Sequence, residues 1–199
     1  MKTLLAFILF ALSSLTYVNA MDNKTIRIST KDTDLILQVG ENGRLYQTYL
    51  GEKLLHEQDL QHFQWNIHAG SDGSVSKRGW EVYGGSGNED FFEPAISITH
   101  HDGNPSTILY YVSSSDKAVE GGTETTILLH DDQYPVEVTL HYIAYPKENI
   151  IKTWSEIRHQ EKKPVTLSSY ASTMLYFNNS GYYLTAVSYT HLTLPTNRE

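Results

Sequence analysis

The chain has 199 residues, no cysteine, and 23 acidic against 15 basic side chains, which gives a formal charge of −8. Without cysteine it cannot be a small scaffold held by disulfides, so its stability has to come from a packed core. The acidic balance argues against a nucleic-acid partner, because such a partner requires a basic patch.

The first twenty residues have the form of a secretory signal peptide. Lys2 precedes an apolar run from Leu4 to Leu12, and Val18-Asn19-Ala20 ends in small residues. The run is too short for a comfortable membrane span, and no later segment is long and apolar enough for one. We therefore expect residues 1–20 to be removed and the mature protein to be secreted or periplasmic. An N-terminal anchor helix is the alternative.

Short strands separated by turn residues follow this segment. The first three are expected at 26–29, 35–39 and 45–50, before a loop-rich stretch at 51–88 that contains two clusters of Gly and Ser. Two hairpins are then expected. One joins 96–99 to 107–112 across the turn at 101–104, and the other joins 123–129 to 136–142.

Alternation of apolar and polar residues supports the later strands. Val136, Val138, Leu140 and Tyr142 alternate with polar residues, which predicts one buried and one wet face. The same reasoning predicts a strand at 165–168 with Val165 and Leu167 on one face, and a less regular strand at 150–157 with Trp154 in the core. Many short strands without an amphipathic helix indicate an all-β, antiparallel sandwich.

Several short motifs occur in an order that resembles the N-terminal domain of secreted bacterial α-galactosidases of glycoside hydrolase family 36. They are LYQTYLG at 45–51, EDFFEPAI at 89–96, YPVEVTLHY at 134–142 and KENIIKTWSEI at 147–157. The similarity runs from about Ile26 to Thr185, with a poor stretch at 61–82. It implies an antiparallel β-supersandwich of the galactose-mutarotase-like kind, incomplete at its C-terminal side. It also implies that the catalytic (β/α)8 barrel is absent from this chain.

The last thirteen residues, 187–199, do not resemble the family. In the family, a segment like Tyr182-Tyr183-Leu184-Thr185 leads into Gly-Asp-Trp-x-x-Glu, which is missing here. We expect residues 187–199 to be a non-native read-through tail and residues 21–186 to be a truncated N-terminal sandwich domain. A natural short C-terminal strand is the alternative.

The resemblance places catalysis outside this chain. In the family, two aspartates of a following barrel act as nucleophile and as acid and base, with retention of configuration. No catalytic residue is therefore assigned here, and no cofactor is expected. The resemblance also implies that the loop at 89–93 lies near the sugar pocket of the barrel or of a neighbouring subunit. Substrate-binding candidates are thus Asp90, with Trp80 or Trp65 as a stacking wall. Asp90 as a turn cap is the alternative.

Two further clusters favour structural roles. Asp131 and Asp132 are neighbours at a turn, where their carboxylates diverge, which favours a solvated turn over a catalytic pair. His100 and His101 are expected on opposite faces of a strand, and with Asp102 they fit no chelating pattern, so we predict no metal site.

Three functions remain open. The first is the N-terminal fragment of a secreted α-galactosidase that acts on galactoside oligosaccharides such as raffinose, with this domain supporting the barrel and a homo-oligomer. The second is a mutarotase-like enzyme on the same fold. Alanine at His100, His130 and His141 would test it, because epimerase activity that survived these changes would exclude it. The third is a free-standing carbohydrate-binding module.

Overall fold

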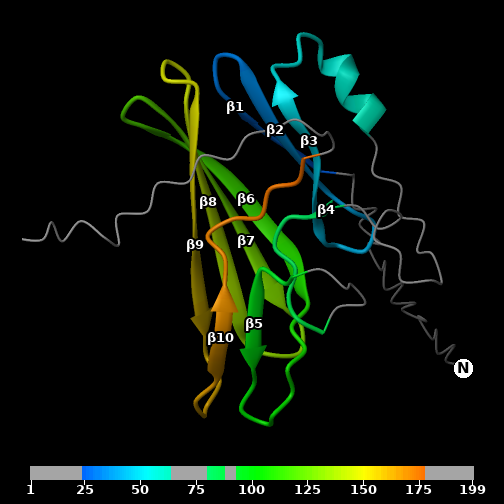
Figure 1. Cartoon of the computed structure of the whole chain (residues 1–199), viewed down its shortest axis with the longest axis vertical. Helices are drawn as coiled ribbons and strands as arrows, with labels where there is room; N and C mark the ends of the chain where they lie inside the picture. Colours follow the sequence, from blue (N-terminus) through cyan, green and yellow to red (C-terminus); the bar gives the residue numbers. More distant parts are fainter. Residues whose placement is uncertain (1–23, 64–79, 88–92, 178–199) are drawn as a thin grey trace, which may run out of the picture.

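A computed structural model describes residues 24–63, 80–87 and 93–177 (Figure 1). These residues form ten strands and one 3-10 helix, and among them there is no α-helix. The elements are β1 (Thr25–Ser29), β2 (Thr33–Val39), β3 (Leu45–Glu52), η1 (Glu57–Phe63), β4 (Trp80–Glu81), β5 (Ile96–Thr99), β6 (Leu109–Val119), β7 (Gly122–Asp131), β8 (Val136–Tyr145), β9 (Ile150–His159) and β10 (Thr166–Tyr170).

The strands form three antiparallel sheets around one core. The first sheet has the order β1-β2-β3-β4, the second pairs β10 with β5, and the third has the order β6-β7-β8-β9. Figure 1 shows β5 and β10 at the lower end of the β6–β9 sheet, and β1 to β4 beside its upper part. Side chains from all three sheets pack into a single buried cluster. This confirms the expected all-β antiparallel sandwich, and no barrel occurs within the part of the chain that the structure describes.

Alternation of side chains produces the buried face of the third sheet. Val136, Val138, Leu140 and Tyr142 of β8 are all buried, while the residues between them are half-buried on the other face. Ile127 of β7 lies opposite Leu140 and has 0% of its surface exposed. The predicted hairpin between these two strands is therefore confirmed, and it contributes much of the apolar area that stabilises the sandwich.

The predicted hairpin between 96–99 and 107–112 is wrong. β5 pairs with β10, which lies about seventy residues later, with Thr99 opposite Thr166 and Ile96 opposite Tyr170. The turn at 101–103 does form, because the His100 amide bonds the Asn104 carbonyl at 2.8 Å. Pro105 has no N–H to continue a ladder after that turn, and β6 pairs with β7 instead.

Two expected burials are also wrong. Trp154 is half-buried on the outer face of β9, because Ile151 and Ile157 occupy the face that packs against the core. Its indole ring stacks on His141 with centroids 4.5 Å apart. Leu167 is 42% exposed, and every residue of β10 is exposed. Val165, just before β10, is half-buried and packs against the core, so only one of the two residues expected on a buried face reaches it.

We expect residues 21–185 expressed alone to be insoluble or oligomeric. Large apolar side chains are more than half exposed at Ile150, Tyr170 and Phe177, and β10 has a single strand partner among the described residues. Exposed apolar area beside an open strand edge favours association between chains. Size-exclusion chromatography with light scattering tests this expectation, and a monomer that unfolds cooperatively would contradict it.

Candidate functional site

Of the three predicted substrate-binding residues, the structure describes one. Asp90 and Trp65 lie outside the described residues. Trp80 is in β4, opposite Gln47 of β3, and its ring stacks on Tyr176 with centroids 4.7 Å apart and planes at 27°. The Tyr176 ring therefore covers part of the indole surface that a sugar ring would need.

The surroundings of Trp80 hold the segment after β10 in place. The Gln47 side chain donates to the Tyr176 carbonyl at 2.6 Å and accepts from the Tyr176 amide at 3.1 Å. It therefore pairs with the backbone of Tyr176 as the peptide group of an adjacent strand would. The Tyr176 hydroxyl donates to the Glu81 carbonyl at 2.9 Å. Arg44 forms an ion pair with the Glu81 carboxylate. Burial by itself would lower the pKa of Arg44, but the charge and hydrogen bonds of Glu81 outweigh it and raise that pKa.

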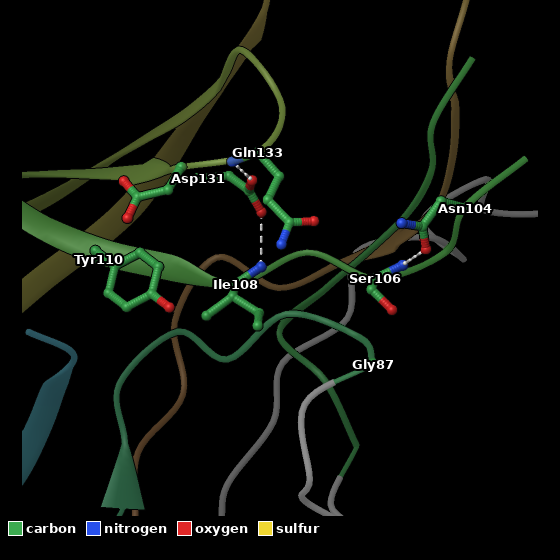
Figure 2. Close-up of a pocket in the computed structure, with 8 residues that line it drawn as sticks. Gly87, Asn104, Ser106, Ile108, Tyr110, Asp131 and Gln133 are labelled. Atoms are coloured by element: carbon green, nitrogen blue, oxygen red, sulfur yellow. Dashed lines mark hydrogen bonds between the residues drawn. The ribbon is translucent and has the colours of Figure 1, made fainter. Parts of the chain in front are cut away.

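A pocket of about 310 Å³ lies elsewhere, between the segment that enters β6 and the turn that follows β7 (Figure 2). Ser106, Ile108 and Tyr110 form one side, and the turn at 131–133 forms the other. Gly87 and Asn104 complete the lining. Its two sides are 20 or more residues apart in sequence, so no local motif could have revealed it.

Asp131 determines the shape of this pocket. Its carboxylate accepts hydrogen bonds from the amides of Gln133 and Tyr134, both at 2.8 Å, and of Ile108 at 2.7 Å. Asp131 is 3% exposed, so it is a buried cap of the turn and not the solvated residue that we expected. Asp132 is exposed, which means that the two carboxylates are in different environments. The Asp131 carboxylate is thus occupied by amides and is not available as half of a catalytic pair.

Asn104 and Gly87 fix the opposite wall. The Asn104 side chain accepts from the Ser106 amide at 3.0 Å and donates to the Tyr134 hydroxyl at 2.8 Å. Gly87 has φ of 81°, and a Cβ there would lie 2.3 Å from the Ser106 hydroxyl oxygen. Only glycine therefore allows this close approach of the two backbones.

A buried cluster around Glu161 lies next to the same loop. His100 Nδ1 lies 2.7 Å from one carboxylate oxygen of Glu161, and His101 Nδ1 lies 2.6 Å from the other. The expectation that the two histidines point to opposite faces is wrong, because both follow the end of β5 and turn toward one carboxylate. The His100 ring also stacks on Tyr134, with centroids 3.5 Å apart and planes at 7°.

The electrostatics of Glu161 follow from these contacts. Burial by itself would raise the pKa of Glu161, but hydrogen bonds from His100, His101 and the His101 amide lower it from an ordinary 4.5 to about 2. Glu161 is therefore ionised at neutral pH and accepts from both rings. Within the described residues, no group of three His, Asp or Glu side chains is arranged to hold a metal ion. The cluster joins the loop after β5 to the segment after β9.

Comparison with protein families identifies the domain. Residues 43–192 match the family model described as the glycosyl hydrolase family 36 N-terminal domain. The chain belongs to glycoside hydrolase family 36. This confirms the resemblance found in the sequence motifs. Among curated proteins, none matches the chain.

Solved structures of family 36 enzymes have the same fold. The α-galactosidase from Lactobacillus brevis superposes with a TM-score of 0.63 at 18% identity, over 76% of this chain and 23% of that one. For α-galactosidase AgaB from Geobacillus stearothermophilus, the TM-score is 0.63 at 21% identity, over 76% and 23%. AgaA from the same organism gives 0.62 at 22% identity, over 75% and 24%. The chain thus spans about a quarter of the length of these enzymes.

The family 36 domain contains features that sequence reasoning did not find. Gln47 and Glu81 contact Tyr176 across more than ninety residues of sequence, and Glu161 reaches His100 across 61. The sequence carries no local signal for such pairs, because each partner is an ordinary polar residue in a strand or a turn. In the described residues there is no helix of sufficient length and apolarity to cross a membrane.

Proposed function

We propose that this domain belongs to an α-galactosidase, a glycoside hydrolase that removes terminal α-linked galactose from oligosaccharides. The observation that carries the proposal is the family match over residues 43–192. The superposed solved structures include α-galactosidases, and variants of AgaA have been solved in complex with raffinose and with stachyose. Raffinose-type galactosides are thus the proposed substrates.

The proposed mechanism is a displacement with retention, performed by two aspartates of a barrel that the described residues do not include. This domain would support that barrel and contribute to a homo-oligomer. Gln47 and Glu81 are suited to the first task, since they fix the backbone at Tyr176, near the end of the described residues. Asp90, Trp80 and Trp65 remain the proposed contacts to sugar, and we propose export to the periplasm or beyond.

The decisive experiment starts with the DNA. Sequencing the source gene beyond the codon for Thr185 should show a frame that continues into Gly-Asp-Trp-x-x-Glu and a barrel with paired aspartates. The purified gene product should then release galactose from raffinose. Proton NMR at early times should show the α-anomer first, as retention requires. No release of galactose would contradict the proposed activity, and a β-anomer formed first would contradict the mechanism.

The mutarotase-like enzyme and the free-standing carbohydrate-binding module are the two alternatives, and measurements on the same gene product distinguish them. His100 is unsuited to a mutarotase-like site, because both of its ring nitrogens are occupied, by Glu161 on one side and by Ser106 and Thr107 on the other. Alanine at His100, His130 and His141 tests such a site, since epimerase activity that survived these changes would exclude it. A gene product that binds galactosides but neither hydrolyses nor epimerises them would instead be a carbohydrate-binding module.

A further inference from the structure

We propose that the pocket between the β7–β8 turn and the segment entering β6 is a second sugar-binding site, which holds one neutral hexose unit. It lies on the sandwich itself and is built entirely from described residues of this domain (Figure 2). The pocket alone supports the existence of a ligand site. The choice of galactose as the hexose rests on the proposed function.

The size of the pocket fits a single ring. Its volume is about 310 Å³, which is at the lower end of the range of small-molecule sites, from about 300 Å³ upward. Asp131 and Asn104 hold its walls through five hydrogen bonds to backbone amides and the Tyr134 hydroxyl. The pocket is therefore formed before a ligand arrives, so binding would cost little ordering of the protein.

The charges of the lining exclude ions. Two carboxylates, Asp131 and Asp132, line the pocket, and no Lys, Arg or His does, so an anion would be repelled. A cation would find Asp132 alone, because three amides already occupy the Asp131 carboxylate. A divalent ion usually needs more oxygen ligands than one free carboxylate supplies. A neutral molecule remains.

The groups that are free to bind suit a polyol. Within the described part of the chain, no hydrogen bond reaches the side chains of Asp132 and Gln133 or the hydroxyls of Ser106 and Tyr110. Asp132 only accepts, Gln133 both donates and accepts, and the two hydroxyls do either. Sugar hydroxyls also donate and accept, and the half-buried Tyr110 ring can lie against the C–H face of a pyranose.

The test uses the intact gene product and two variants, Asp132→Ala and Gln133→Ala. Both side chains are exposed and make no hydrogen bond in the described structure, so their loss should leave the fold intact. Glu148→Ala is the matched control, because it removes an exposed carboxylate from the β8–β9 turn. Labelled D-galactose is measured by equilibrium dialysis, with 1-deoxygalactonojirimycin at the lowest concentration that abolishes raffinose turnover, so that the barrel is filled while a weaker second site stays open. An AgaA variant has been solved with this compound.

With the barrel occupied, the wild type and Glu148→Ala should each still bind about one galactose per chain. Asp132→Ala should weaken that binding roughly tenfold, which is the loss expected for one hydrogen bond to a charged group. Gln133→Ala should weaken it less, and turnover of raffinose at saturation should be unchanged in both variants. The proposal would be overturned if the wild type bound no galactose while the barrel is occupied. It would also be overturned if both variants bound this galactose as tightly as the wild type.

This result is separable from the proposed function. A gene product without α-galactosidase activity whose galactose binding still depends on Asp132 would contradict the enzyme but support the site. An active α-galactosidase that binds no residual galactose would support the proposed enzyme and contradict the second sugar site. Calcium that competes with galactose and requires Asp132 would identify a cation site and overturn the assignment to a sugar.

Discussion

Replacing Glu161 by alanine should lower the free energy of unfolding of this domain by about 3 kcal/mol. The Glu161 side chain is 1% exposed, and its loss leaves the fully buried His100 ring without its partner at Nδ1. A buried polar group that loses its partner retains the whole cost of leaving water. The His101 ring and the His101 amide lose the same acceptor, although His101 is more exposed. The effect should therefore exceed that of a surface substitution several-fold.

The measurement is hydrogen exchange by mass spectrometry on the intact gene product, read on peptides that cover 96–110 and 150–165. Glu148→Ala is the control, because Glu148 is exposed at the β8–β9 turn. Glu161→Gln should give an intermediate loss, since an amide oxygen can replace one acceptor but not both. Equal exchange in the Glu161→Ala and Glu148→Ala variants would show that the cluster does not stabilise the loop.

The same carboxylate predicts an acid-sensitive step in stability. The pKa of Glu161 is about 2 in the folded domain, below its ordinary 4.5. A depressed pKa means that the stabilising contribution is complete above about pH 4.5 and is lost as the pH falls to about 2. Urea unfolding between about pH 5 and about pH 2 should thus show the wild type losing more stability than Glu161→Ala. Parallel curves would contradict this assignment.

Replacing Gly85 by alanine should prevent stable folding of the domain, or cost more than about 4 kcal/mol. A Cβ at Gly85 would lie 2.0 Å from the carbonyl oxygen of Thr107, which is backbone and cannot rotate away. The surrounding bonds would be displaced with it: Ser86 N–H to the Ile96 carbonyl at 3.0 Å, and Thr107 N–H to the Ser86 carbonyl at 2.9 Å. Gly85 itself forms a bridge with Ile96, which is fully buried.

Soluble yield and thermal unfolding of the gene product test this prediction. Gly51→Ala is the milder comparison, because its Cβ would meet the end of a side chain, the Tyr49 hydroxyl at 2.8 Å, and not backbone. A shift of that hydroxyl would disturb its exposed hydrogen bond to the Glu52 carbonyl. We expect Gly51→Ala to fold with a loss below about 1 kcal/mol. A Gly85→Ala protein as stable as this control would show that the backbones of 84–86 and 106–108 are not packed as the structure describes.

Prediction from sequence succeeded where the signal was local. The alternation in β8 was sufficient because burial of one face imposes a period of two, and Val136 to Tyr142 follow it throughout. It failed for Trp154, whose strand has large apolar residues on both faces, so periodicity alone could not decide which face meets the core. It also failed for β5, because the pairing of adjacent strands is a tendency and not a rule.

In the candidate site, too, local features could be predicted from the sequence and contacts between distant residues could not. Of the predicted sugar contacts, Trp80 is in the short strand β4, inside the stretch that we expected to be loop-rich. Its stacking on Tyr176 depends on a residue 96 positions later. The adjacency of Asp131 and Asp132 suggested a turn, which is present. The Asp131 carboxylate is buried beside the amide of Ile108, which donates to it from 23 residues earlier in the chain.

The sequence by itself therefore determined the strand content, the family and the acidic, cysteine-free character of this domain, because these depend on composition, period and motif order. The tertiary structure alone decided which strands pair across long intervals, why two histidines share Glu161, and where a pocket opens beside Tyr110. These features depend on contacts between residues far apart in the chain. The free energy of such contacts comes from burial and from satisfied polar groups, and no local pattern records either.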